Sequence, residues 1–150
     1  MLVGLIADTH GLLRPEALEA LAAAELILHA GDVGRRSVLD ALRGLAPVYA
    51  VAGNVDGSDP ELRAAIDLVL EGVRVHVSHG HELGSPTPDV LATRYAADVI
   101  VYGHTHCALI TTVGPTLVVN PGAAGAARFD LKPSVALLTL PSREARIVIL

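Results

Sequence analysis

Five apolar runs in this chain each end at polar residues that are able to bind a metal ion. The runs and the residues after them are VGLIA before Asp8-Thr9-His10, LILHA before Gly31-Asp32, VYAVA before Gly53-Asn54, VHVS before His79-Gly80-His81, and VIVY before Gly103-His104-Thr105-His106. Apolar runs of this kind are typical of strands, and the carboxyl ends of strands in an α/β sheet form its binding edge. We therefore predict that strands bring these polar residues to one edge of one sheet.

The residues at the ends of these runs offer oxygen and imidazole donors and no sulfur. Gly31-Asp32 or Gly53-Asn54 alone would be equally typical of a turn, since Gly, Asn and Asp favour turn conformations. The pair His104 and His106 is more informative, because two imidazoles two residues apart after a buried strand are costly unless they are solvated or coordinated. Seven such donors at one edge are too many for a single ion, so the sequence predicts two adjacent metal ions that share a ligand.

The composition predicts one domain over residues 1–150. Hydrophobic residues make up 51% of the chain, which is enough to bury a large core at this length. The net charge of −5, with Lys and Arg scattered, argues against a surface for long nucleic acids or for membranes. Arg35-Arg36 is a small local cluster that could still meet a phosphate, although a solvated Arg35 is the simpler interpretation.

Nothing in the sequence marks the chain for export. The start MLVGLIADTH lacks the basic segment of a signal peptide, and the single cysteine, Cys107, excludes an internal disulfide. Residues 108–127 carry no charge and are long enough to span a bilayer, but Gly114-Pro115 and Asn120-Pro121-Gly122 would break a helix twice. We therefore expect a cytoplasmic protein without a membrane span.

Three helices are expected in the first two-thirds of the chain. Pro15 begins the first, which should end near Ala24. The second runs from Val38 to Arg43 with Ser37 as its N-cap, and the third starts at Thr87-Pro88-Asp89 and ends near Tyr95.

The strand pattern predicts a mixed sheet followed by a second sheet. Strict alternation over residues 73–78 favours a half-covered antiparallel strand, whereas the apolar residues 99–102 favour a strand buried on both faces. Strands with hairpin spacing, which together predict the second sheet, are expected at residues 109–113, 116–119, 135–140 and 145–150. The last of them could pair with a second copy of the chain through residues 147–150 if it lies at an edge, which would give a homo-oligomer.

The ordered motifs D-x-H, G-D, G-N-x-D, H-G-H and G-H-T-H resemble those of the calcineurin-like metallophosphoesterases, in particular their small single-domain bacterial and archaeal phosphodiesterase branch. The resemblance runs from Asp8 through Asn120-Pro121-Gly122. It implies an α/β fold, a four-layer αββα sandwich in which two mixed β-sheets are flanked by helices. It also implies an enzyme that hydrolyses phosphodiester bonds with two divalent metal ions per chain, most often Mn²⁺, with iron, zinc and nickel as alternatives.

The resemblance assigns a role to each donor. The ligands of the first ion would be Asp8, His10, Asp32 and His106, and those of the second would be Asn54, His79 and His104, with Asp32 bridging. Many relatives carry a His after the Asn, proposed to protonate the leaving group, but here that position is Val55. We expect Asn54 and His81 to act in catalysis, since His81 lies two residues after a ligand and could reach the substrate or orient His79.

Charge bookkeeping supports hydrolysis at such a site. Two divalent ions less the charges of Asp8 and Asp32 leave a net charge of about +2, which a hydroxide and one phosphodiester anion neutralise. We therefore predict metal-bound hydroxide as the nucleophile and a small phosphoester as the substrate. Phosphomonoester hydrolysis at the same site is the nearer alternative. A non-catalytic metal-binding interaction module is the other, because a retromer subunit shares this scaffold with part of the ligand set lost.

Other polar residues have simpler interpretations. His29 and His76 lie inside strand runs, where a satisfied core histidine or a half-exposed one is favoured over catalysis. Cys107 is expected to be a small buried thiol. Asp56 could hydrogen-bond a ligand imidazole, but the residues around it also read as a plain turn.

Overall fold

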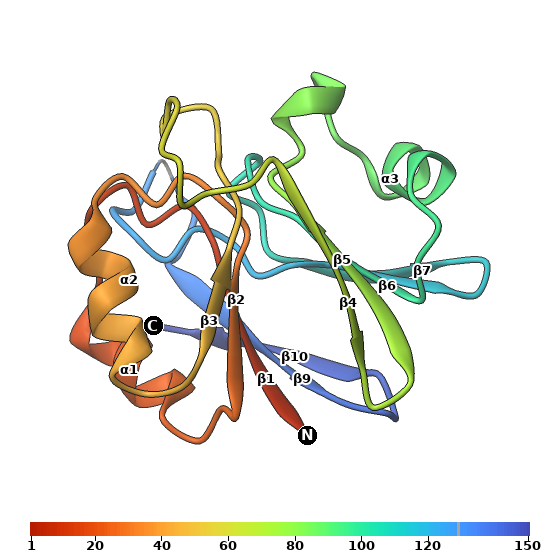
Figure 1. Cartoon of the computed structure of the whole chain (residues 1–150), viewed down its shortest axis with the longest axis horizontal. Helices are drawn as coiled ribbons and strands as arrows, with labels where there is room; N and C mark the ends of the chain where they lie inside the picture. The colour runs from red at the N-terminus through yellow and green to blue at the C-terminus, as the bar shows by residue number, and fades with distance from the viewer. Residues whose placement is uncertain (129) are drawn as a thin grey trace.

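The computed structural model describes residues 1–128 and 130–150 and shows two five-stranded sheets stacked face to face (Figure 1). The first sheet has the order β10-β9-β1-β2-β3. Its strands are β1 (Leu2–Ile6), β2 (Leu26–His29), β3 (Val48–Ala50), β9 (Ser134–Thr139) and β10 (Glu144–Ile149). The strands β1, β2 and β3 are parallel, whereas β9 runs antiparallel to both β1 and β10.

The second sheet has the order β4-β5-β6-β8-β7. Its strands are β4 (Ala65–Leu70), β5 (Val73–Ser78), β6 (Val99–Val101), β7 (Leu109–Val113) and β8 (Thr116–Asn120). The central strands β5, β6 and β8 are parallel, and the edge strands β4 and β7 are antiparallel to their neighbours. Both sheets are therefore mixed.

Helices cover the two outer faces, so the layers are αββα (Figure 1). The helices α1 (Pro15–Leu21) and α2 (Arg36–Arg43) pack on the first sheet, where Leu21 and Leu42 join Ile27 in one apolar cluster. The helix α3 (Pro88–Arg94), which follows the short 3-10 helix η1 (His81–Leu83), packs on the second sheet through Leu91. A third cluster of apolar side chains fills the space between the sheets. The predicted four-layer architecture is confirmed.

Two of the helix boundaries differ from the sequence prediction. The first helix ends at Leu21 rather than near Ala24, because the chain must turn back there to enter β2. Leu21 and Ala24 close over Gly4 of β1, where a Cβ atom would lie only 2.7 Å from Cδ2 of Leu21. The second helix begins at Arg36, so the prediction of Ser37 as its N-cap is wrong. The third is as predicted, with Thr87 Oγ1 accepting a hydrogen bond from the backbone N–H of Val90.

The strand pattern was predicted only in part. Strand β4 was missed, since its partner β5 is reached through a two-residue turn at Glu71-Gly72, both at positive φ, that lacks the usual Asn-Gly or Asp-Gly signature. Strand β5 is antiparallel to β4, as predicted, but parallel to β6. All of its residues except Arg74 are buried, so the prediction of a half-covered strand is wrong. The last four strands do not form one sheet: β7 and β8 join the second sheet, and β9 and β10 join the first.

This topology brings loops from both sheets to one end of the sandwich. The backbone N–H of Asp8, just after β1, donates to the carbonyl of Gly31, just after β2. In the second sheet, the N–H of Gly103, after β6, donates to the carbonyl of His79, after β5. The polar residues that follow the apolar runs therefore meet at an edge shared by the two sheets. The prediction that one sheet carries them all is wrong.

Candidate metal centre

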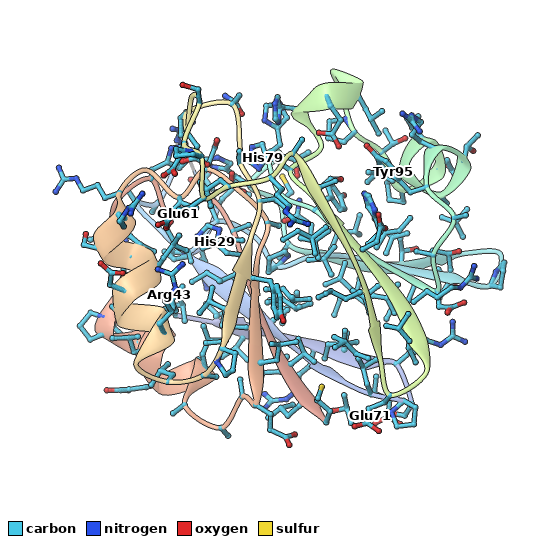
Figure 2. All side chains as sticks on the ribbon, viewed as in Figure 1. His29, Arg43, Glu61, Glu71, His79 and Tyr95 are labelled. Carbon is cyan, nitrogen blue, oxygen red and sulfur yellow. The ribbon has the colours of Figure 1, made fainter. Side chains whose placement is uncertain are left out.

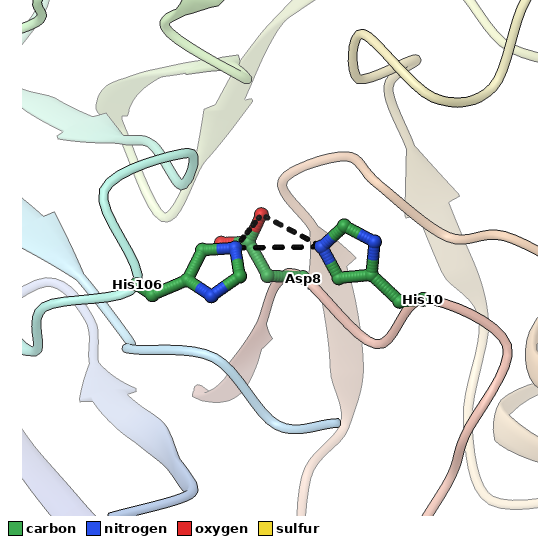
Figure 3. Close-up of side chains that lie close together, drawn as sticks. All are labelled: Asp8, His10 and His106. Carbon is green, nitrogen blue, oxygen red and sulfur yellow. Dashed lines mark hydrogen bonds and ion pairs between the residues drawn. The ribbon is translucent and has the colours of Figure 1, made fainter. Parts of the chain in front are cut away.

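Three of the predicted ligands form a tight cluster at this rim (Figure 3). Oδ1 of Asp8 lies 4.0 Å from Nε2 of His10 and 3.5 Å from Nε2 of His106. The two Nε2 atoms are 3.4 Å apart. Asp8 and His10 come from the loop after β1 and His106 from the loop after β6, so the cluster joins the two sheets.

A second cluster lies beside the first. Oδ1 of Asn54 is 3.1 Å from Nε2 of His79 and 3.2 Å from Nδ1 of His104. Asn54 follows β3 in the first sheet, whereas His79 and His104 follow β5 and β6 in the second. This cluster is therefore also assembled across the two sheets.

One oxygen atom connects the two clusters. Oδ2 of Asp32 lies 3.5 Å from Nε2 of His10 in the first cluster and 3.2 Å from Nε2 of His79 in the second. Its other oxygen, Oδ1, accepts a hydrogen bond from the N–H of Val55. The structure thus brings all seven predicted ligands together, with Asp32 in the middle.

The donors are arranged as a cation would need them. Oδ1 of Asp8 is buried and has no hydrogen-bond donor among the described residues, although it faces three imidazoles. Nδ1 of His79 lies 2.7 Å from the carbonyl of Ala30; it is therefore the protonated nitrogen, and Nε2 presents its lone pair to the cluster. Oxygen and imidazole donors suit Mn²⁺, Fe²⁺ or Zn²⁺. The residues present therefore fit a pair of divalent ions.

Backbone strain is concentrated at the same residues. Seven residues other than glycine have a positive φ in the part of the chain that the structure describes, and five of them are predicted ligands: Asp8 (52°), His10 (47°), Asp32 (53°), His104 (70°) and His106 (61°). Such a conformation costs about 1–3 kcal/mol for a residue with a Cβ atom and persists where the surrounding structure enforces it. These loops therefore give up stability to hold their donors in place.

The carboxyl groups of Asp8 and Asp32 have very different pKa values. Desolvation raises the pKa of Asp8 to about 7, with the negative charge of Asp32 adding to the effect. Burial also acts to raise the pKa of Asp32, but the close contact with the imidazole of His79 and the hydrogen bond from the N–H of Val55 outweigh it and lower the value to about 2. In the metal-free protein Asp32 is therefore ionised at neutral pH, whereas Asp8 holds its proton much more readily than an ordinary carboxyl group.

The imidazoles are mostly held neutral. Burial lowers the pKa of His10 and His104, and lowers that of His106 to about 4, where the positive charge of Arg128 is the next cause. His79 is the exception, because its contacts with the carboxylates of Asp32 and Asp8 raise its pKa in spite of burial. Neutral imidazoles are the form that binds metal ions.

Residues outside the predicted set organise the loops. Asp56 accepts hydrogen bonds from three backbone N–H groups, those of Val33, Gly34 and Gly53, so it ties the loop of Asp32 to the loop of Asn54. The prediction that it could bind a ligand imidazole is wrong. Asn120 holds the loop of His104 and His106 as a donor: its Nδ2 donates to the carbonyl of Gly103 and to Oγ1 of Thr105. Turn residues with a carboxylate or amide were the available signal for both, but most of their partners lie far away in sequence.

The remaining singled-out residues lie around the centre. The ring centroid of His81 is 5.3 Å from that of His79 and 6.3 Å from that of His104, and its side chain is partly exposed. Val55 is 49% exposed beside Asn54 and lines a small hollow of about 90 Å³ with Arg35 and Asp56. Arg128, which the sequence reasoning missed, lies near enough for its charge to affect His106.

Three further predictions can be scored. His29 is fully buried with both ring nitrogens hydrogen-bonded, so it is the satisfied core histidine that was predicted. His76 is also buried, stacked on Tyr95 with Nδ1 hydrogen-bonded to Asp67, but its Nε2 has no hydrogen-bond partner among the described residues, so only its burial is as predicted. Cys107 is exposed, because the chain does not resume a strand until Leu109, and the prediction of a buried thiol is wrong. Among the described residues, no helix is long and apolar enough to cross a membrane.

Comparison with known proteins places this geometry in a family. A family model described as the calcineurin-like phosphoesterase superfamily domain matches residues 1–143. A probable metallophosphoesterase of Methanothermobacter thermautotrophicus is 37% identical, with the alignment covering 93% of this chain and 86% of the relative. The solved structure of an archaeal phosphodiesterase covers 100% of both chains at 25% identity with a TM-score of 0.84. Vps29 of Entamoeba histolytica complexed with Zn²⁺ covers 98% of this chain and 90% of its own at 27% identity, also with a TM-score of 0.84. The chain therefore belongs to the calcineurin-like phosphoesterase superfamily, and it is a metal-dependent phosphoesterase.

Proposed function

We propose that the protein hydrolyses phosphodiester bonds at a centre of two divalent metal ions, with Mn²⁺ as the native metal. The observation that carries this proposal is the position of Asp32, whose Oδ2 atom faces a ligand of each cluster at 3.5 and 3.2 Å. A single carboxylate oxygen in that position is what a bridging ligand requires.

The chain's own residues would divide the work. Asp8, His10 and His106 would hold one ion, and the second would be held by Asn54, His79 and His104, with Asp32 shared. Two divalent ions bound there would lower the pKa of water so that it ionises into a nucleophile, and would offset the charge of the phosphoryl group. The two carboxylates leave a net charge of about +2 for hydroxide and one diester anion.

Two residues at the open side would act on the substrate. Asn54 presents a neutral amide at the rim, where it can orient a phosphoryl oxygen as well as ligate a metal ion. His81 lies beside the second cluster and is not a proposed ligand, and it would protonate the leaving oxygen, since the side chain of Val55 has no acidic proton to give. The exposed side chain of Val55 leaves room beside Asn54 for an apolar leaving group.

Turnover with two aryl phosphates tests the proposal. The protein is stripped of metal, reconstituted with Mn²⁺, and offered bis(4-nitrophenyl) phosphate and 4-nitrophenyl phosphate. We expect faster release of nitrophenol from the diester, and loss of turnover in Asp32→Asn but not in Asp40→Asn, which removes one charge from the exposed surface of α2. Faster turnover of the monoester would reassign the site to phosphomonoesters. Absence of metal-dependent turnover on both would favour a non-catalytic interaction module.

A further inference from the structure

Two residues buried behind the centre are polar but are not ligands. Thr9 lies between Asp8 and His10, and His29 is the last residue of β2, just before the loop of Asp32. Both are 0% exposed. Figure 2 labels His29 inside the molecule, below His79 in that view. A buried polar group costs free energy unless it is hydrogen-bonded, so the contacts of these two side chains require an explanation.

The contacts form a chain of hydrogen bonds with one direction. The N–H of Gly31 donates to Nδ1 of His29 at 3.2 Å, so this nitrogen must be the unprotonated one. The proton of the neutral ring is therefore on Nε2, which donates to Oγ1 of Thr9 at 3.0 Å. The hydroxyl of Thr9 then donates to the carbonyl of Val33 at 2.9 Å.

This series of hydrogen bonds connects the two loops that hold three of the proposed ligands. It starts at Gly31 and ends at Val33, the two neighbours of Asp32 in sequence. Between them it passes through Thr9, which lies between Asp8 and His10. Every polar atom in it has a partner. Burial lowers the pKa of His29 to about 4, so the ring stays neutral at neutral pH and keeps both roles.

The hydrogen bonds of Thr9 and His29 connect loops whose backbone is strained. Asp8, His10 and Asp32 all have positive φ, and Gly31 has a φ of 91°. Backbone hydrogen bonds from the N–H of Asp8 to the carbonyl of Gly31 and from the N–H of His10 to the carbonyl of Asp32 align the two loops, and the carbonyls of Asp8 and Thr9 accept from Gly125 and Leu12. The hydroxyl of Thr9 adds a side-chain bond from the buried side, which ties the segment of Asp8 and His10 to Val33, directly after Asp32.

We propose that Thr9 and His29 are positioning residues that hold Asp8, His10 and Asp32 in the geometry needed to bind two divalent metal ions. This inference rests on the proposed function, because it assigns the two residues to the same centre. Residues that orient metal ligands through hydrogen bonds typically change metal affinity by about 10–100-fold when they are replaced.

Titration of the metal-stripped chain with Mn²⁺ tests the inference by calorimetry. Thr9→Val keeps the shape of the side chain and removes the hydroxyl, and we expect Mn²⁺ affinity to fall by about 10–100-fold. Thr9→Ser restores the hydroxyl and should bind Mn²⁺ within about threefold of the natural chain. Thr116→Val is the matched control, since Thr116 is also buried and its hydroxyl donates to a backbone carbonyl, that of Ala97, but it lies at the start of β8 away from the centre. This control should leave Mn²⁺ affinity unchanged.

The tautomer of His29 is a second and independent measurement. Nitrogen-15 spectra of the metal-free chain should show His29 protonated at Nε2, and a ring protonated at Nδ1 would overturn the inference. So would a Thr9→Val variant that binds Mn²⁺ as tightly as the natural chain, or one that fails to fold, because the hydroxyl would then serve the fold rather than the centre. Failure of the natural chain to bind Mn²⁺ would instead overturn the proposed function, and this inference with it.

Discussion

Replacing His104 by glycine should give a more stable metal-free protein than replacing it by alanine. His104 has a φ of 70°, a conformation that glycine adopts freely and alanine does not. Both substitutions remove the imidazole and its contact with Asn54, so the difference between them isolates the backbone. Asn54 is the matched control, because its side chain makes the other half of that contact while its φ is not positive.

The magnitude follows from two opposing contributions. A residue with a Cβ atom loses roughly 1–2 kcal/mol in the left-handed region relative to glycine. Glycine in turn loses about 0.4–1 kcal/mol through the greater freedom of its unfolded chain. At position 104 the glycine variant should therefore have a free energy of unfolding about 0.5–1 kcal/mol higher than the alanine variant. At position 54 the alanine variant should be the more stable one, by about 0.4–1 kcal/mol.

Urea denaturation followed by circular dichroism, in the presence of a chelator, measures all four variants. The order of the glycine and alanine variants should reverse between His104 and Asn54, with a difference between the two pairs of about 1–2 kcal/mol. The same order at both positions would mean that His104 is not strained. The interpretation of the loops as strained supports for metal ligands would then be wrong.

Three further predictions concern charge, metal content and the leaving group. Elemental analysis after reconstitution with Mn²⁺ should find about two ions per chain, and a value that stays near one in the natural chain would exclude a pair bridged by Asp32. Because burial raises the pKa of Asp8 from 3.8 to about 7, the stability that protonated Asp8 contributes is complete below pH 3.8 and is lost as pH rises through 7. Metal-free Asp8→Asn should therefore be more stable than the natural chain in urea at pH 8, with a smaller difference at pH 5; equal differences at the two pH values would contradict the raised pKa. In a plot of log rate against leaving-group pKa, Val55→His should flatten the slope by adding an acid worth about 10²–10⁴-fold for poor leaving groups, and His81→Ala should steepen it. A slope unaffected by either substitution would leave both positions without a role in proton transfer.

The proposed ligands could be picked out from the sequence because each one follows an apolar strand. That pattern is local: a run such as VIVY before Gly103 and His104 is visible without knowing which strands are neighbours. The allocation of strands to sheets is not local. Strand β8 lies beside β6 rather than continuing a separate C-terminal sheet, and this order depends on which apolar faces the two sheets bury against each other. The one-sheet prediction failed for that reason.

Residues that support the ligands were beyond the sequence for a related reason. His29 was correctly predicted to be a core histidine. Its hydrogen-bond partners are Gly31 and Thr9, and Thr9 is 20 residues away in sequence, so the sequence alone did not reveal that contact. Asp56 was predicted either to hydrogen-bond a ligand imidazole or to belong to a plain turn, but its carboxylate accepts hydrogen bonds from backbone N–H groups that lie 22 and 23 residues before it and from one nearby. Only the folded chain reveals such partners.

The strained backbone of the proposed ligands and the buried polar residues behind them have one physical explanation. Residues with a Cβ atom do not adopt positive φ unless contacts elsewhere enforce it, and five such residues gather here at the mouth of a buried polar network. A chain selected for stability alone would place glycine at these positions and apolar side chains behind them. Departures from local preference concentrated at one rim therefore support the proposed centre independently of any motif, because the binding of a ligand there returns free energy that they cost.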